Sequence, residues 1–293
     1  MIEKLRRKLF KNTTYRIDNY NILIPTSFKL PTYQKEFSLY DRFLPVLAKN
    51  LNVSDHTIID VGANVGDTLV AMIQKCHNRF ICIEPSDFFF TYLEKNTQNL
   101  IPEDAKRVIL LKSLVGTGEF SGELKEINGS TASIVLSTTD KSNVEVTENR
   151  MTYNRLDDIV QHHSDIILLK SDVDGFDFDV IRSAEKIIEE SEPILFFENH
   201  IDNDFQYIEF DKLYDFLKDK GYLNLYIFDN FGNIIVEKSD YHTLRNINEY
   251  VYRMKKYQVT RTFYYTDILV TSDKWLPIVD KAILDYKKNW LTK

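Results

Sequence analysis

The fold of this chain is decided by the stretch IIDVGANVGDT, residues 58–68. An apolar run ends in Asp60, after which the chain passes through a glycine-rich turn into a helix-forming segment. Gly62 lets the backbone turn tightly and approach a ligand closely. Asn64 tolerates left-handed geometry, and Gly66 allows close packing of the helix against the strand. The stretch therefore predicts a buried strand, a nucleotide-type loop and a helix.

Acidic residues around this loop indicate which ligand it holds. Asp67 and Thr68 suit the N-terminus of a helix. Asp60 puts a carboxylate beside the loop, where it would repel a pyrophosphate but suits an ammonium or a sulfonium group. Glu84 follows Gly62 by 22 residues at the tip of the next strand, where a carboxylate can bind two ribose hydroxyls. The alternative interpretation is an ordinary strand–turn–helix with surface acids.

The composition excludes several classes of protein. Hydrophobic residues make up 43% and charged residues 28% of the chain, which excludes collagen, long disorder and a pure coiled coil. The net charge of -7 argues against a nucleic-acid partner, because such proteins usually carry a basic surface. No apolar stretch approaches about 18 residues, so no transmembrane segment is predicted.

The cysteines and the first residues bear on the cellular compartment. Cys76 and Cys82 both fall in segments predicted to be buried, which disfavours a disulfide framework or a zinc site and predicts a reducing cytoplasm. Residues 1–11, MIEKLRRKLFK, are rich in basic side chains and lack the apolar core of an export signal. They predict a solvated amphipathic helix, with a weak peripheral membrane contact as the alternative.

Short apolar runs alternate with helical stretches along most of the chain. This order predicts right-handed crossovers and a parallel sheet. The runs IILLK and ILFF are continuous rather than alternating, as expected of strands that are buried on both faces. The predicted strands are 57–61, 80–84, 108–114, 166–171, 193–198, 222–228 and 263–271. The predicted helices are 38–51, 67–75, 87–99, 177–190 and 209–220.

Several segments depart from this rhythm. Residues 14–25 predict a pair of strands, and the polar residues 115–152 predict hairpins. Residues 229–262 predict a turn at 230–233 followed by a helix rich in Tyr, Arg and Lys. The last strand, 263–271, has no room for a crossover helix after it, so we expect it to join the sheet edge in the antiparallel sense.

A second group of polar residues lies in IILLKSDVDGFDFD, residues 166–179. Lys170 and Asp172 alternate at the end of an apolar strand and so share one face. The next strand, PILFFENH, ends in three polar residues at the same sheet edge: Glu198, Asn199 and His200. Ligands of an open parallel sheet bind beyond the carboxyl ends of its strands.

Two chemistries are open to this group. Asp172, Glu198 and Asn199 offer the oxygen ligands that a hard divalent cation such as magnesium prefers. They could equally bind substrate hydroxyls, with one of them acting as general base. The alternative without chemistry is a Lys170–Asp172 pair, a helix-capping Asp174 and a solvent-exposed loop histidine at His200.

At this point the sequence resembles the FkbM family of S-adenosylmethionine-dependent methyltransferases. The likeness covers roughly residues 57–200, where six blocks fall in the family's order; any one block alone would not be specific. Asp174 stands where Glu is frequent in the family, and Ser113 and Leu114, where the adenine is expected, match poorly. The six blocks are IIDVGANVGDT, CIEPS, STASIV, NRLDDIV, LLKSDVDGFDFDVI and PILFFEN.

The resemblance implies an α/β fold of the class I methyltransferase type. This is a Rossmann-like three-layer sandwich with a mostly parallel seven-stranded sheet and an antiparallel last strand. The implied activity is O-methyl transfer to a hydroxyl of a sugar or nucleotide-sugar, in the biosynthesis of surface polysaccharides or natural products. The residues expected to bind S-adenosylmethionine are Asp60, Gly62, Asn64, Gly66, Asp67, Thr68, Glu84, Ser113 and Asp172.

We expect the catalytic groups at the ends of the two later strands. A sugar hydroxyl is a weak acid, so a base or a metal is needed to make it nucleophilic. Asp172 and Glu198 are the candidate bases or magnesium ligands, together with Asn199 as a ligand. His200 is the reserve base, and Lys170 orients Asp172.

The remaining expectations concern the acceptor and the rival functions. Residues 1–50 form an extension covering the acceptor site, and residues 51–293 form the methyltransferase domain. The acceptor site, for a small molecule or a glycan, uses residues 14–45 and 229–262. The alternatives are an amine, carboxyl or phosphoramidate acceptor, a dinucleotide oxidoreductase and a non-catalytic cofactor-binding scaffold; the oligomeric state, including a homo-oligomer, is open.

Overall fold

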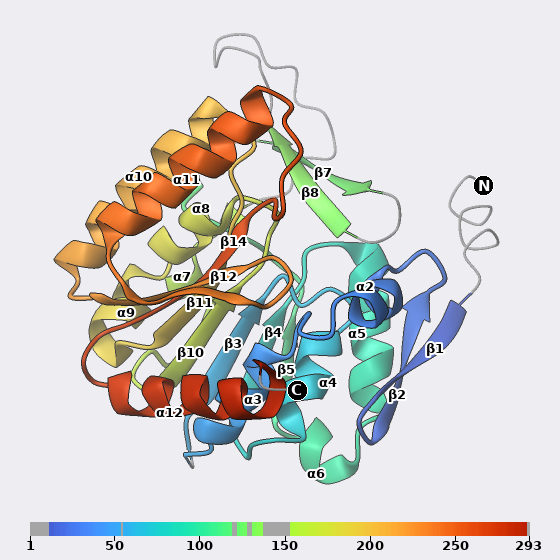
Figure 1. The fold of residues 1–293 in the computed structure, drawn as a ribbon. Helices are drawn as coiled ribbons and strands as arrows, with labels where there is room; N and C mark the ends of the chain where they lie inside the picture. The colour runs from blue at the N-terminus through green and yellow to red at the C-terminus, as the bar shows by residue number, and fades with distance from the viewer. Residues whose placement is uncertain (1–11, 54, 119–121, 128–130, 137–152, 292–293) are drawn as a thin grey trace, which may run out of the picture.

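The short apolar runs of the sequence form a mixed sheet of eight strands in the computed structural model (Figure 1). The structure describes residues 12–53, 55–118, 122–127, 131–136 and 153–291. The predictions for residues 1–11 and 137–152 lie outside these ranges. Within them, no helix is both long and apolar enough to cross a membrane.

The sheet has the order β13-β12-β14-β11-β10-β3-β4-β5. Five strands, from β11 to β5, are parallel to their neighbours within the group. This confirms the prediction of a mostly parallel α/β sheet, and β3 and β10 have the predicted bounds. The strands are β3 (Thr57–Val61), β4 (Arg79–Ile83), β5 (Val108–Leu111), β10 (Ile166–Ser171), β11 (Ile194–Asn199), β12 (Asn224–Asp229), β13 (Ile234–Ser239) and β14 (Thr266–Thr271).

Two details of the sheet differ from the prediction. The last strand, β14, is antiparallel as expected, but it inserts between β11 and β12 rather than joining the edge. The sheet also has eight strands instead of seven, because β13 folds back on β12 after the turn at Asp229–Asn233. Alternate side chains of β13 are exposed, as on an edge strand with one open face, so it lacks the continuous apolar run of the buried strands.

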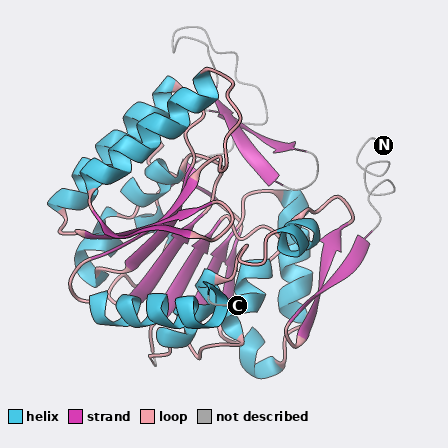
Figure 2. Ribbon diagram, viewed as in Figure 1, coloured by secondary structure: helices cyan, strands magenta, loops and turns pink. Residues whose placement is uncertain are grey.

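Helices cover both faces of the sheet, giving the predicted three layers (Figure 2). One face packs against α3 (Phe43–Asn50), α4 (Asp67–Ile73), α5 (Asp87–Gln98) and α12 (Leu276–Tyr286), which continues into the π-helix η1 (Lys287–Leu291). The other face packs against α7 (Leu156–Ile159), α8 (Asp177–Arg182), α9 (Glu185–Ser191), α10 (Asp204–Asp219) and α11 (Tyr241–Lys256). Short helices α2 (Leu30–Glu36) and α6 (Pro102–Ala105) complete the described helices.

Some helix boundaries differ from the prediction for local reasons. The helix expected over 38–51 begins only at Phe43, because Asp41 has a φ of 57° that an α-helix does not accept. The helix expected over 177–190 is interrupted after Arg182 and resumes as α9. The helices α2 and α12 have no counterpart in the sequence prediction, which left no room for a helix after the last strand.

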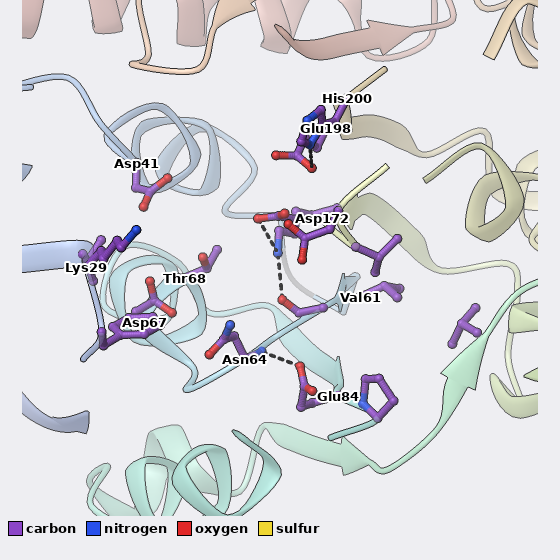
Figure 3. Close-up of a pocket in the computed structure, with 18 of the residues that line it drawn as sticks. Lys29, Asp41, Val61, Asn64, Asp67, Thr68, Glu84, Asp172, Glu198 and His200 are labelled. Carbon is purple, nitrogen blue, oxygen red and sulfur yellow. Dashed lines mark hydrogen bonds and ion pairs between the residues drawn. The ribbon is translucent and has the colours of Figure 1, made fainter. Parts of the chain in front are cut away.

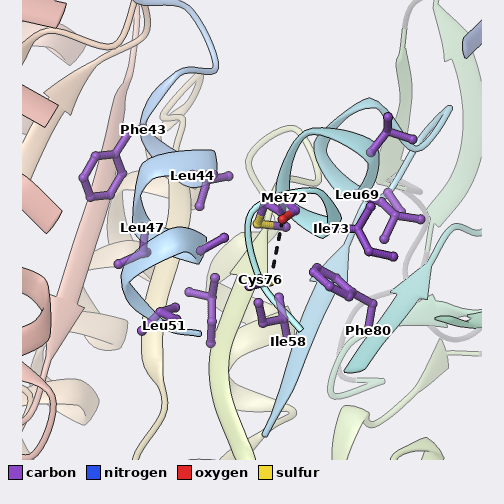
Figure 4. Packing of buried hydrophobic residues seen from close by; sticks show 14 of the residues in the cluster. Phe43, Leu44, Leu47, Leu51, Ile58, Leu69, Met72, Ile73, Cys76 and Phe80 are labelled. Carbon is purple, nitrogen blue, oxygen red and sulfur yellow. Dashed lines mark hydrogen bonds between the residues drawn. The ribbon is translucent and has the colours of Figure 1, made fainter. Parts of the chain in front are cut away.

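The first face has a continuous apolar core around α3 and α4 (Figure 4). Leu47, Ile58 and Phe80 are fully buried there. Burying one such side chain stabilises a fold by about 1.5–3 kcal/mol, so this layer fixes the position of α4 and of the loop before it. Cys76 and Cys82 are buried, free thiols, as predicted.

The N-terminal hairpin is tied to the loop between β3 and α4. It consists of β1 (Asn12–Ile17) and β2 (Tyr20–Pro25), which confirms the predicted strand pair. The buried side chain of Asn96 on α5 donates to the carbonyls of Leu23 and Val65, at 2.9 and 2.8 Å, and accepts from the Leu23 amide at 2.7 Å. One amide therefore links the hairpin, α5 and the loop.

Two pairs of short strands lie outside the main sheet. β6 (Leu114–Val115) pairs in parallel with β9 (Tyr153–Asn154), and β7 (Gly122–Ile127) pairs in antiparallel with β8 (Thr131–Leu136). The second pair confirms a hairpin within 115–152.

The order of the main sheet places the ligand site. From β3 the chain runs to β4 and β5 on one side, then returns to β10 and β11 on the other. The reversal leaves a crevice between the carboxyl ends of β3 and β10, which is where ligands bind in open α/β sheets.

Candidate functional site

A cavity of about 400 Å³ opens at this reversal (Figure 3). Its floor consists of the residues that follow β3, β4, β10 and β11, and its walls include α4 and the segment from Phe28 to Asp41. Ligand cavities in proteins usually hold about 300–1,000 Å³. The two groups of polar residues that the sequence predicts therefore meet in one cavity of ligand size.

The glycine loop is shaped by one close backbone approach. Gly62 has a φ of 76°, and a Cβ there would lie 1.9 Å from the carbonyl oxygen of Asp172. Asn64 adopts a φ of 50°, as its sequence position predicts. Gly66 does not line the cavity; a Cβ there would lie 2.8 Å from Leu93 Cδ1, so this glycine lets α4 approach α5.

Glu84 lies at the tip of β4 and faces the cavity although it is 4% exposed. Its two oxygens accept hydrogen bonds from the amides of Asn64, at 3.0 Å, and Ser86, at 2.8 Å. Burial raises the pKa of Glu84 to about 7, while the two amides lower it. A carboxylate has further lone pairs beyond these two bonds, so Glu84 can also accept ligand hydroxyls.

Asp60 does not present its charge to the cavity, contrary to the sequence interpretation. Its side chain is fully buried, and its Oδ1 lies 2.9 Å from Lys170 Nζ. The register explains the pair, because Asp60 and Lys170 are direct partners on β3 and β10. Lys170 also donates to the Gly62 carbonyl at 3.2 Å, so the pair supports the glycine loop from below.

Lys170 therefore has a different main partner from the predicted one. Burial lowers the pKa of its ammonium, but the carboxylates of Asp60 and Asp172 outweigh burial and raise it. Asp172 Oδ2 lies farther away, at 3.7 Å, and its side chain is 55% exposed on the cavity wall. The backbone of Asp172 is fixed by its amide, which donates to the Val61 carbonyl at 3.1 Å.

The first turn of α4 and the segment before β6 complete the near wall. Asp67 and Thr68 both line the cavity, and burial raises the pKa of Asp67 to about 6. Ser113 also lines the cavity, and its hydroxyl accepts a hydrogen bond from Asn154 at 2.9 Å.

Glu198 and His200 extend the site from the end of β11. Glu198 is 6% exposed and its Oε2 has no hydrogen bond within the described residues; His200 Nδ1 lies 3.7 Å away. Burial raises the pKa of Glu198. Burial alone would lower the pKa of His200, but Glu198 outweighs it and raises it. The imidazole stacks on Tyr265 and has Asp202 at 3.0 Å from Nε2.

Asn199, which the sequence predicts as a metal ligand, does not line the cavity. Its amide nitrogen donates to Asn248 and Thr266, and its oxygen accepts from Tyr214 at 2.6 Å, so the side chain is committed inside the protein. Among the residues that the structure describes, no group of three or more His, Cys, Asp or Glu side chains has a metal-binding arrangement.

Several polar residues around the cavity do not follow from the sequence pattern, among them Tyr40, Asp41 and Asp267. Asp41 lies in a left-handed turn that the helical pattern of 38–51 conceals. Asp267 lies inside the apolar last strand. An acidic residue is unusual there, so it could have indicated a functional position. Tyr265 lines the cavity, whereas Tyr226 is fully buried.

Comparisons with known proteins give a family and several distant structures. The family described as "Methyltransferase FkbM domain" matches residues 60–223. Methyltransferase FkbM from Methylobacillus flagellatus KT is 14% identical, with 83% of this chain and 58% of that chain covered and a TM-score of 0.39. The O-methyltransferase from Bacillus cereus, in complex with SAH, is 12% identical, with 83% and 88% covered and a TM-score of 0.45.

This chain thus spans less than two thirds of the Methylobacillus protein. None of the curated proteins matches it significantly.

Proposed function

This chain belongs to the FkbM methyltransferase family, and from that premise we propose that it transfers a methyl group from S-adenosylmethionine to a hydroxyl of a sugar. The observation that carries the proposal is the single cavity at the sheet reversal. It brings Glu84, the Gly62 loop and Asp172 to one space of about 400 Å³.

The residues around the glycine loop fit this cofactor. Glu84 would accept the ribose hydroxyls, because its carboxylate faces the cavity and keeps free lone pairs beside its two amide bonds. The absent Cβ of Gly62 keeps the backbone of the loop open to close approach. Asp67 offers the negative charge that suits a sulfonium or an ammonium. Thr68 and Ser113 are proposed as further contacts.

S-adenosylmethionine supplies a methyl group on a positively charged sulfur, which is already a strong methyl donor. The chain must therefore align an acceptor oxygen and remove its proton. Alignment can contribute about 7–11 kcal/mol to lowering the barrier, and general base catalysis about 10²–10⁴-fold in rate.

We assign the general base to Asp172. Its backbone packs directly against Gly62, so its carboxylate lies next to the loop proposed to hold the cofactor. Its side chain is exposed to the cavity, where an acceptor hydroxyl can reach it. The Lys170 ammonium, 3.7 Å away, limits the directions in which the carboxylate turns. Glu198 and His200 form the reserve pair on the far wall.

We further propose that the N-terminal extension covers the acceptor. Its residues Leu30, Tyr33 and Tyr40 line the same cavity as Glu84 and Asp172. Residues 51–293 would then hold the cofactor and the catalytic groups.

A transfer assay tests the function. The protein is incubated with S-adenosylmethionine that carries an isotopically labelled methyl group and with neutral, amino and phosphorylated sugars. Label on a sugar oxygen, lost in Asp172→Ala, is the expected result. Label on nitrogen, a carboxyl or a phosphoramidate would replace the sugar hydroxyl as acceptor. Cofactor binding without transfer to any acceptor class would favour the non-catalytic scaffold.

A further inference from the structure

Carboxylates outnumber cations around the cavity. Six carboxylates line it, against two lysines and one histidine. Lys170 is already paired with the fully buried Asp60, so a carboxylate outside the cavity largely neutralises its charge. Lys29 also lines the cavity, from an exposed position directly before α2. The six carboxylates are Asp41, Asp67, Glu84, Asp172, Asp174 and Glu198.

Two acids on the far wall face each other across neighbouring strands. Glu198 of β11 and Asp267 of β14 are direct partners in the antiparallel register. Like charges directly opposite each other destabilise a sheet. Glu198 is 6% exposed, and its Oε2 has no hydrogen bond in the described part of the chain but lies 3.7 Å from His200 Nδ1. Burial and the charge of Glu198 raise the pKa of Asp267 well above its ordinary value.

A side chamber continues the cavity toward these acids. It has a volume of about 60 Å³, room for about two water molecules, and shares Tyr40, Asp41, Asp172 and Tyr265 with the main cavity. Asp267 lines the side chamber but not the main cavity. The chamber is therefore large enough for one small polar group of a ligand.

The protein supplies little positive charge to the side chamber. Asp41 and Asp267 make neither a hydrogen bond nor an ion pair through their side chains to any residue that the structure describes. Arg42 also lines the chamber, and its Nη2 donates to Gln34 at 3.0 Å. His200, 3.7 Å from Glu198 Oε2, does not line the chamber. One guanidinium thus faces three carboxylates, those of Asp41, Asp172 and Asp267.

We infer that the acceptor is an amino sugar, and that its ammonium group binds in the side chamber between Asp41 and Asp267. This inference rests on the proposed methyl transfer and names its acceptor class. A cation there relieves the repulsion between Glu198 and Asp267 from the Asp267 side, where Arg42 is the one cationic side chain that lines the chamber among the described residues. It leaves Asp172 free to take the proton of a hydroxyl. A phosphate or a carboxylate would meet like charge, so phosphorylated sugars and nucleotide-sugars are excluded.

A two-step calorimetric titration of the full chain tests the inference. First, S-adenosylhomocysteine is titrated into the protein; absence of binding here counts against the proposed function. Second, the saturated complex is titrated with glucosamine, glucose and glucose 6-phosphate at about pH 7. We expect glucosamine to bind about tenfold or more tightly than glucose, and glucose 6-phosphate to bind more weakly than glucose. Equal binding of glucosamine and glucose, or absence of glucosamine binding, overturns the inference.

Proton release on binding and three variants test whether the side chamber causes the preference for glucosamine. An ammonium favours the ionised carboxylates, so glucosamine should release protons; the same titration in two buffers of different ionisation enthalpy measures this. Asp41→Asn and Asp267→Asn should each reduce glucosamine affinity toward that of glucose without changing S-adenosylhomocysteine binding. Asp219→Asn, an exposed acid at the far end of α10, removes the same charge and should change neither. Full glucosamine affinity in both chamber variants contradicts the inference.

Discussion

Gly62 follows β3, Asp172 follows β10, and their backbones approach closely at the centre of the site. A Cβ at Gly62 would lie 1.9 Å from the Asp172 carbonyl oxygen, while Gly221, with a similar φ of 83°, has nothing within 4 Å. Comparing alanine variants of Gly62 and Gly221 separates the free-energy cost of a left-handed backbone from that of a steric clash. It is the residue-scale test of whether the loop is built for close approach.

Gly62→Ala should therefore destabilise the protein by clearly more than Gly221→Ala. The second variant bears only the strain of alanine at positive φ, about 1–2 kcal/mol. The first must in addition push the loop and the Asp172 backbone apart, and should abolish cofactor binding. Urea unfolding and calorimetry with S-adenosylhomocysteine measure the two effects. Equal destabilisation of the two variants would show that the contact is not tight.

Asp172→Ala should nearly abolish turnover, by about 10²–10⁴-fold, and leave cofactor binding intact, because the side chain faces the acceptor side of the cavity. The assay compares kcat and the S-adenosylhomocysteine affinity of the variant with those of the parent. Asp172→Asn keeps the shape and removes the charge. Retained turnover in both variants would remove Asp172 from the role of base.

The acids that sequence reasoning missed show why residue roles are hard to predict. Asp41 depends on a left-handed turn, and Asp267 depends on a strand register that brings it opposite Glu198. Neither follows from local pattern. Asp60 was misread for the same reason: its partner Lys170 lies 110 residues away in sequence and meets it only through the register of β3 and β10.

Elements were predicted well where burial alone dictates the pattern. β3 and β10 are buried at every position, and their continuous apolar runs gave the observed bounds. β13 was missed because its exposed face carries charged residues inside a segment interpreted as turn and helix. The position of β14 could not be predicted either, since insertion between two strands depends on contacts distant in sequence.

The side chain of Asn96 links the N-terminal hairpin to the glycine loop. Asn96→Ala removes three hydrogen bonds that join β2, α5 and the loop at Val65. It should cost about 1–3 kcal/mol of stability, because buried backbone groups lose their partners, and it should weaken cofactor binding. Gln98→Ala, an exposed position at the end of the same helix, should stay within about 0.5 kcal/mol.

Unchanged cofactor affinity in a destabilised Asn96→Ala would show that the hairpin contributes to folding but not to the shape of the loop. Urea unfolding and calorimetry on the two variants distinguish these outcomes.

At the scale of the whole molecule, the cavity makes stability depend on pH. Burial raises the pKa of Asp67 to about 6, of Glu84 to about 7 and of Asp41 to about 8, from ordinary values of 3.8 and 4.5. The folded state therefore holds these protons more tightly than the unfolded state. Their contribution is fully present below about pH 4 and is lost as the pH rises to about 8.

We expect the free energy of unfolding of the ligand-free protein to fall across this window, and the fall to be smaller in the double variant Asp41→Asn/Asp67→Asn. Urea unfolding at several pH values measures it. If the free energy of unfolding of the double variant depends on pH as that of the parent does, the pKa values of these two acids are not raised in the folded protein.

The proposed function requires that the cavity bind S-adenosylmethionine, and calorimetric titration with S-adenosylhomocysteine measures that binding. NAD is titrated in parallel, and Glu84→Ala serves as the control because Glu84 faces the cavity from the tip of β4. We predict micromolar binding of S-adenosylhomocysteine, lost in Glu84→Ala, and no binding of NAD. Binding of NAD in place of S-adenosylhomocysteine, or no binding of either, would contradict the account.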